Sequence, residues 1–129
     1  MRNPQFLPVL VVDDSRTTTA VIRACLAELG VTNVDEVESG EAALRMINVK
    51  NYGVIISDWH MSPINGPDLL KKVRERAGAI KPKFAFVTMD DRWSNITTAR
   101  TLGADAFIVK PDNPRALRNK IGAFMGTRA

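Results

Sequence analysis

Short apolar runs alternate along this chain with longer segments that repeat apolar residues at helical spacing. The runs span about residues 8–12, 54–57, 83–87 and 106–109, and a further strand is expected at 34–37, where Asp35 and Glu36 suit an exposed edge of the sheet. Runs of this length, separated by helical patterns, are typical of βα units, in which successive strands pair in parallel. Because such crossovers are right-handed, helices would cover both faces of one sheet. We therefore predict an α/β fold, a doubly wound (βα)₅ sheet, with residues 1–129 forming a single domain.

The segments between the runs carry the spacing and the end signals of helices. Ser39 and Asn113-Pro114 are expected to begin two of them, and Pro67 lies near the first position of a third. Gly30 and Gly103 are expected to end two others. The positions that this spacing predicts to face the sheet are Ile22, Cys25, Leu26, Leu29, Leu44, Ile47, Leu70, Val73, Ala77, Ile96, Ala99, Leu102, Leu117, Ile121 and Phe124.

The apolar runs are far shorter than the roughly 20 residues that a membrane-spanning helix needs. Residues 1–8 lack the apolar core of a signal peptide, and Asp13-Asp14 follow soon after. Cys25 is the one cysteine, so it cannot form an internal disulfide, which fits a reducing compartment. We expect a cytoplasmic protein with no membrane association.

The net charge of +4 raises the question of nucleic-acid binding. The basic residues are dispersed, no Lys/Arg block is interleaved with aromatic residues, and no recognition motif is present. We therefore expect no nucleic-acid partner and interpret these charges as solvated helix faces. A basic surface could also favour an acidic protein partner.

Four of the apolar runs end in polar residues that could handle a phosphoryl group. The ends are Asp13-Asp14, Ser57-Asp58, Thr88 and Lys110-Pro111. Because the carboxyl ends of neighbouring parallel strands lie along one edge, three carboxylates, a hydroxyl and an ammonium would share one crevice. Carboxylate oxygens are the ligands that Mg²⁺ prefers. The Mg²⁺ ion and the lysine ammonium would offset the negative charge of a phosphoryl group. The pattern therefore predicts a Mg²⁺ and phosphoryl site.

Each of these residues, taken alone, has a simpler explanation. Asp13 or Asp14 could cap the following helix, although Ser15 is also available for that role. The others could be an ordinary turn aspartate, a strand-end threonine and a solvated surface lysine. Since these explanations require four strand ends to match by coincidence, we favour a shared site.

These residues give the chain a resemblance to a bacterial two-component response regulator receiver domain, of the CheY-like single-domain chemotaxis type. The resemblance runs from about Val9 to Phe124. The motifs that carry it are Asp13-Asp14, Asp58-Trp59, Ile64-Asn65-Gly66, Thr88 and Lys110-Pro111. It implies a flavodoxin-like, CheY-like sheet of strand order 2-1-3-4-5, with the site where that order reverses, between the first and third strands.

By this resemblance Asp58 is the phosphoacceptor, whose carboxylate attacks a phosphohistidine and forms an acyl phosphate. The donor would be a histidine kinase or a histidine phosphotransfer domain. Asp13, Asp14, Asp58 and the backbone carbonyl of His60 would hold Mg²⁺, while Lys110 and Thr88 would contact phosphoryl oxygens. Such a protein catalyses its own phosphorylation and dephosphorylation but is a signalling switch rather than a metabolic enzyme.

In the family, phosphorylation changes the surface of the fourth helix, fifth strand and fifth helix as a strand-five aromatic turns inward. Phe107 occupies that aromatic position, with permanent burial in the core as the alternative. Trp93 is a candidate interface anchor, with intramolecular packing as the alternative. Only Met125 to Ala129 follow the last expected helix, so the output would be a protein contact, such as the flagellar motor switch or another kinase, or onward phosphotransfer.

The chain departs from the family pattern around the site. Pro63 follows the phosphoacceptor by five residues rather than four, and Met89 replaces a small residue and could narrow access. His60 and Asp90 occupy two positions that tune acyl-phosphate lifetime in the family, although His60 could simply be a surface residue. The resemblance also implies a cis peptide bond at Lys110-Pro111.

Two other functional classes are compatible with this fold. The first is a receiver used as a constitutive docking module, which would bind its partner without phosphorylation; the complete acid set argues against it. The second is a small-ligand enzyme, such as a flavin carrier or an Asp-dependent phosphatase. The run Asp58-Trp59-His60 lacks the second aspartate that such a phosphatase carries two residues after the first.

Overall fold

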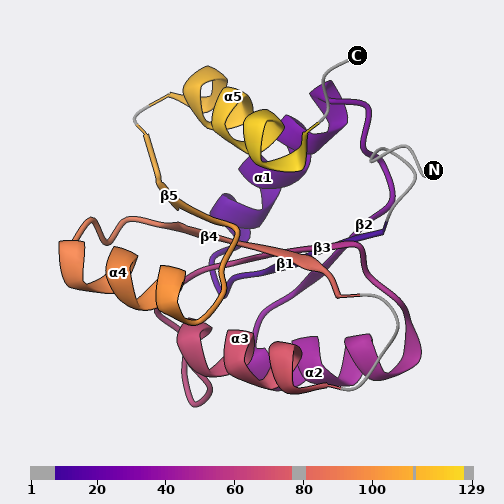
Figure 1. Cartoon of the computed structure of the whole chain (residues 1–129). Helices are drawn as coiled ribbons and strands as arrows, with labels where there is room; N and C mark the ends of the chain where they lie inside the picture. Colours follow the sequence, from indigo (N-terminus) through magenta and orange to yellow (C-terminus); the bar gives the residue numbers. More distant parts are fainter. Residues whose placement is uncertain (1–7, 77–80, 112, 127–129) are drawn as a thin grey trace.

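Strands and helices alternate strictly along the chain (Figure 1). The computed structural model describes residues 8–76, 81–111 and 113–126. In chain order the elements are β1 (Val9–Val12), α1 (Arg16–Glu28), β2 (Val34–Val37), α2 (Gly40–Val49), β3 (Val54–Ser57), α3 (Gly66–Glu75), β4 (Lys83–Thr88), α4 (Trp93–Thr101), β5 (Ala106–Val109) and α5 (Pro114–Met125). The predicted alternation is therefore confirmed.

The sheet has five strands in the order β2-β1-β3-β4-β5, and every neighbouring pair is parallel. This is the predicted fold class and strand order. Strand β2 lies on one side of β1, and β3, β4 and β5 follow one another on the other side. The direction in which strands are added therefore reverses between β1 and β3. The carboxyl ends of these two strands therefore form the crevice in which such sheets bind ligands.

Side chains of the central strands alternate between two apolar layers, one on each face of the sheet. In β1, Val9 and Val11 join one layer while Leu10 and Val12 join the other, and all four are fully buried. Helices α1 and α5 cover the first face, and α2, α3 and α4 cover the second (Figure 1). A sheet covered on both faces explains why the strands read as continuous apolar runs.

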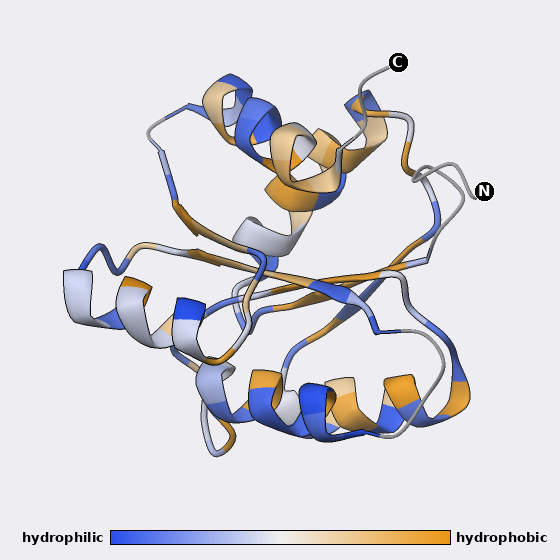
Figure 2. Cartoon of the chain, in the orientation of Figure 1, coloured by the Kyte–Doolittle hydropathy of each residue, from blue (hydrophilic) through white to orange (hydrophobic). Residues whose placement is uncertain are grey.

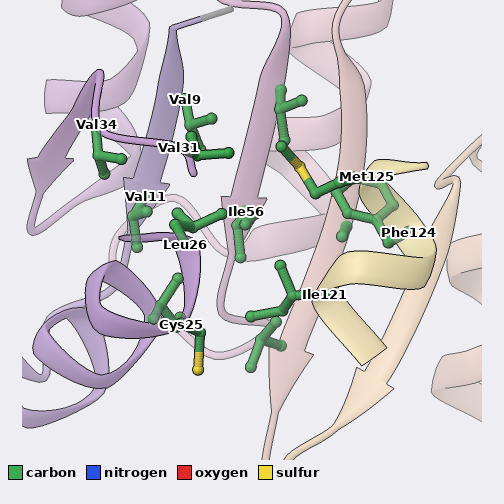
Figure 3. Packing of buried hydrophobic residues seen from close by; sticks show 14 of the residues in the cluster. Val9, Val11, Cys25, Leu26, Val31, Val34, Ile56, Ile121, Phe124 and Met125 are labelled. Carbon is green, nitrogen blue, oxygen red and sulfur yellow. The ribbon is translucent and has the colours of Figure 1, made fainter. Parts of the chain in front are cut away.

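The layer under α1 and α5 shows how these helices are fixed to the sheet (Figure 3). Leu26 of α1 and Ile121 of α5 are fully buried against the central strands, and each such side chain contributes about 1.5–3 kcal/mol. Cys25 is buried in the same layer, and its thiol lies 3.6 Å from the backbone carbonyl of Pro114. The two helices are therefore held to each other as well as to the sheet.

Helix ends follow the predicted capping residues. The side chains of Ser39 and Asn113 each accept a backbone N–H in the first turn of α2 and α5. Ser15 caps α1 by accepting the N–H of Thr18 at 3.2 Å, which leaves the adjacent aspartates free for another role. Gly30 has a φ of 84° where the chain leaves α1, a conformation that glycine adopts without steric cost.

Two strand limits differ by one residue from the prediction. Strand β1 begins at Val9 rather than Pro8, which has no N–H to donate to a neighbouring strand. Strand β4 extends to Thr88, because this residue pairs with Val109 of β5. Ala77, predicted to face the sheet, lies outside the described residues.

Helix α4 buries fewer of its residues than the other helices. Figure 2 draws it mostly in white and blue, and Ala99 is its one buried residue, while the predicted inward positions Ile96 and Leu102 are half-buried. Its first turn has no side-chain cap. A pocket of about 180 Å³ lies between α4 and β5 and is bordered by Phe107.

In the part of the chain that the structure describes, no helix is both long and apolar enough to cross a membrane.

Candidate metal and phosphoryl site

The three predicted carboxylates converge at the switch point of the sheet. Strand pairing sets Val12 of β1 beside Ser57 of β3, so the residues that follow them also lie side by side. One carboxylate oxygen from each of Asp13, Asp14 and Asp58 lies within 4.8 Å of the others. Asp13 is buried, Asp58 is half-buried and Asp14 is exposed, so the cluster opens to solvent on one side.

Backbone amides orient two of these carboxylates. Asp13 Oδ1 accepts the N–H of Ser15 at 2.8 Å, and Asp58 Oδ1 accepts the N–H of Trp59 at 2.7 Å. The backbone N–H of Asp58 donates to the carbonyl of Val12 at 3.0 Å, which ties the two strand ends together. The cluster is therefore held by backbone geometry before any ligand binds.

The pKa of Asp13 is raised to about 6, chiefly by burial, and the neighbouring carboxylates of Asp58 and Asp14 act in the same direction. The hydrogen bond from the Ser15 amide and the charge of Lys110 act in the opposite direction. Three oxygen ligands on crowded carboxylates match the preference of Mg²⁺, which keeps several waters and needs few protein ligands. The donor set therefore fits a divalent cation, whose charge would offset the repulsion among the acids.

Thr88 and Lys110 lie at the ends of the next two strands. Thr88 is buried, and its hydroxyl oxygen accepts the N–H of Asp90 at 3.2 Å, which leaves the hydroxyl proton available for a phosphoryl oxygen. The backbone N–H of Lys110 donates to the Thr88 carbonyl at 2.8 Å. The Lys110 ammonium donates to the hydroxyl of Thr18 on α1 at 2.7 Å.

Sequence reasoning missed Thr18. A signal for it does exist, because Thr18 lies one helical turn after Asp14, on the helix that leaves the site. Thr17 and Thr19 flank it, however, and the sequence does not show which hydroxyl of the three faces Lys110. Thr18 is buried, with 7% of its surface exposed, whereas Thr17 is exposed.

His60 and Asp90 contact each other across the mouth of the site. His60 Nε2 lies 2.6 Å from Asp90 Oδ2, which also receives Arg92 Nη2 at 2.6 Å and Asn95 Nδ2 at 2.8 Å. The Arg92 guanidinium, its backbone N–H and the His60 hydrogen bond hold the pKa of Asp90 well below its usual range. These contacts link the β3–α3 loop to the start of α4, a link that the sequence pattern did not reveal.

The β3–α3 loop packs tightly beneath Asp58. A Cβ added at Gly66 would lie 2.5 Å from the Asp58 carbonyl oxygen and 2.7 Å from a ring carbon of Phe86, so only glycine fits there. The peptide bond between Ser62 and Pro63 is cis. The bond between Lys110 and Pro111 is not cis, so that expectation is wrong. X–Pro bonds favour trans by about 0.5–1 kcal/mol, and the residue types alone do not decide which isomer the folded protein adopts.

An aromatic cluster connects Asp58 with β5. Trp59 is 7% exposed, and its ring centroid lies 4.9 Å from that of Phe86 and 5.5 Å from that of Phe107, both in edge contacts. Phe107 is half-buried between this cluster and the pocket beside α4. Its partial exposure fits neither a fully buried core residue nor a free surface residue.

Trp93 and Met89 are exposed. Trp93 shows 74% of its surface and Met89 shows 75%, both close to the start of α4. The alternative in which Trp93 packs within the molecule is therefore not what the structure shows. An exposed indole ring of this size is unusual on a protein surface without a partner and is a common interface anchor.

A doubly wound parallel sheet with an acidic cluster at its switch point defines the class of α/β proteins that bind ligands outside their strand ends. Within that class, the family model described as the response regulator receiver domain matches residues 9–122. The chain therefore belongs to the response regulator receiver family, as the sequence motifs predicted.

Curated relatives and solved structures agree with this assignment. The chain is 34% identical over 122 residues to the chemotaxis protein CheY1 of Helicobacter pylori, covering 94% of this chain and 98% of that protein. It is 32% identical over 115 residues to the chemotaxis protein CheY of Pseudomonas aeruginosa, covering 89% and 93%. The solved chemotaxis response regulator CheY4 of Vibrio cholerae matches with a TM-score of 0.81 at 26% identity, covering 92% of this chain and 98% of that one.

Proposed function

We propose that this protein is a single-domain response regulator that accepts a phosphoryl group on Asp58 from a phosphohistidine, with Mg²⁺. The convergence of the Asp13, Asp14 and Asp58 carboxylates beside the ends of β4 and β5 is the observation that carries this proposal. The donor would be a histidine kinase or a histidine phosphotransfer domain.

The chemistry assigns one role to each residue. An Asp58 carboxylate oxygen attacks phosphorus, a P–O bond forms as the P–N bond to histidine breaks, and the imidazole leaves. Asp13, Asp14 and Asp58, with the His60 carbonyl, would hold Mg²⁺, which supplies charge neutralisation when bound. Lys110 balances the charge on one phosphoryl oxygen, and the Thr88 hydroxyl donates a hydrogen bond to another.

The output would pass through the surface formed by α4, β5 and α5. Asp58 contacts the Trp59 backbone, and the Trp59 ring contacts Phe107, which borders the pocket beneath α4. Because α4 buries little apolar surface, a small change at Phe107 can shift the position of α4 at a low cost in free energy. The curated relatives are chemotaxis proteins, so we propose the flagellar motor switch or a chemotaxis kinase as the partner class.

Fluorescence of Trp59 tests the proposed function directly. The chain has two tryptophans, so Trp93→Phe leaves Trp59 as the one reporter. Beryllofluoride with Mg²⁺, a mimic of the bound phosphoryl group, should change Trp59 emission because the backbone N–H of Trp59 donates to the acceptor carboxylate. Unchanged emission, with no phosphate gained from acetyl phosphate, would favour the constitutive docking module.

Replacing Trp93 with alanine should weaken partner binding without affecting phosphorylation. An exposed aromatic anchor typically costs 2 kcal/mol or more on truncation, so we expect affinity for the partner to fall by roughly thirtyfold. Titration of the phosphorylated protein against the kinase or switch protein measures this. Val49, 81% exposed at the end of α2, gives the control Val49→Ala, which should bind normally. Equal affinity of Trp93→Ala and wild type would exclude Trp93 from the interface.

A further inference from the structure

The Lys110 ammonium is held by a hydroxyl of helix α1 rather than by a carboxylate of the site. Its Nζ lies 2.7 Å from Thr18 Oγ1. Among the ion pairs of the described residues, none joins Lys110 to Asp13, Asp14 or Asp58. A lysine on a flexible stem beside three acids would ordinarily pair with one of them. We propose that Thr18 is a positioning residue that keeps Lys110 beside the acid cluster but off its carboxylates, so that these stay free for the divalent cation.

This inference rests on the proposed function and adds to it a residue outside the motifs that identify the family. The Thr18 hydroxyl accepts one hydrogen bond from the Lys110 ammonium, and the other two N–H groups of the ammonium remain available. Those donors can serve a phosphoryl oxygen when one arrives. Thr18 thus fixes the position of the ammonium before a phosphoryl group binds, and Lys110 supplies the positive charge.

The local structure explains why Thr18, and not a neighbouring threonine, fills this role. Ser15 caps α1 by accepting the Thr18 N–H, which fixes the first turn of the helix. The hydroxyl of Thr19 donates to the Arg16 carbonyl at 3.0 Å, so it is engaged within the helix. Thr17 is exposed. Thr18 and Thr19 are both buried, and Thr18 is the one whose hydroxyl contacts Lys110.

A second contact fixes the same two segments to each other. Cys25, two turns further along α1, has its thiol 3.6 Å from the carbonyl of Pro114, the first residue of α5. Thr18 and Cys25 therefore contact Lys110 and Pro114, one residue on each side of the connection between β5 and α5. The position of the ammonium thus depends on α1 and not only on the lysine's own strand.

Loss of the hydroxyl should release the ammonium onto the nearest carboxylates. It would then compete with Mg²⁺ for the same oxygens and would be misplaced for a phosphoryl oxygen. For Thr18→Val, which preserves shape, we expect the Kd for Mg²⁺ to rise by roughly ten- to a hundredfold, the scale of one hydrogen bond to a charged group. Thr18→Ser should restore affinity close to that of wild type.

A double-mutant cycle tests this, with Mg²⁺ titrated against Trp59 fluorescence in wild type, Thr18→Val, Lys110→Ala and the double variant. We expect Thr18→Val to weaken Mg²⁺ binding when Lys110 is present and to have no effect when it is absent. Thr17→Val, an exposed neighbour, is the matched control and should match wild type. Urea unfolding checks that each variant folds.

Two outcomes would overturn the positioning role. One is an equal loss of Mg²⁺ affinity with and without Lys110, which would mean that Thr18 only supports the fold. The other is unchanged affinity in Thr18→Val. Both outcomes leave the phosphoacceptor proposal standing, because that proposal fails on a separate measurement, the absence of phosphate on Asp58 in the wild-type protein.

Discussion

Asp58→Asn should take up no phosphate from acetyl phosphate or from a phosphorylated kinase. The asparagine amide matches the carboxylate in size but is not a nucleophile for phosphorus and cannot form a mixed anhydride. Removing a nucleophile outright typically lowers the rate by at least about a thousandfold, because no other group carries out the same step. Labelled phosphate on the intact protein, measured after rapid separation from the donor, gives the result.

The neighbouring carboxylates supply graded controls. Asp68, an exposed residue in the first turn of α3, gives Asp68→Asn, which should label at the wild-type level. Asp14→Asn keeps the acceptor but removes a proposed metal ligand, so it should label slowly and recover partly at high Mg²⁺. Labelling of Asp58→Asn at the wild-type rate would contradict the proposed function, since the acceptor would then lie elsewhere.

The fold could be predicted because its sheet is covered on both faces. Each buried parallel strand reads as a continuous apolar run, as in Val54–Ser57, and the cap residues Ser39 and Asn113 mark helix starts that the structure confirms. The acid cluster was predictable for a related reason. Parallel pairing fixes which strand ends meet, so Asp13 and Asp58 come together from backbone register alone.

What the sequence did not reveal depends on side-chain direction over long separations. Lys110 and Thr18 are 92 residues apart, and no spacing rule connects the end of β5 to a particular hydroxyl on α1. The link between His60 and Asp90 likewise joins two loops whose paths follow from packing. Helix α4 was harder to orient, because Ala99 is its one buried residue.

Millimolar Mg²⁺ should stabilise the protein strongly above about pH 6 and progressively less below it. The metal-free folded state holds Asp13 with a pKa raised from 3.8 to about 6, chiefly by burial. Because the folded state then binds protons more tightly than the unfolded state, ionised Asp13 costs stability. This cost is fully present above the folded pKa and is relieved as the pH falls from about 6 toward 4.

The raised pKa of Asp13 corresponds to a cost of roughly 2–3 kcal/mol at neutral pH. A bound cation stabilises the ionised cluster, so its effect on the melting temperature should grow with the logarithm of free Mg²⁺. Protonation of Asp13 competes with the metal, which weakens that effect at lower pH. Thermal melts at several pH values, with and without Mg²⁺, measure both dependences.

Asp13→Asn separates the cost of the charge from the gain of the metal. Without Mg²⁺ at neutral pH, this variant should be more stable than wild type by about 1–3 kcal/mol, because the amide is neutral and can still accept the Ser15 N–H. Its stability should vary less between about pH 4 and 6, and Mg²⁺ should no longer raise its melting temperature by the wild-type amount.

Asp35 provides a control of the opposite sign. Hydrogen bonds from Lys50 and Tyr52 lower the pKa of Asp35, so its ionised form stabilises the fold above its ordinary pKa and that contribution is lost as the pH falls. Asp35→Asn should therefore destabilise the protein at neutral pH and leave the Mg²⁺ response intact. If Asp13→Asn instead lowers metal-free stability and keeps the full response to Mg²⁺, the buried carboxylate is a structural acceptor for Ser15 and the cation binds elsewhere.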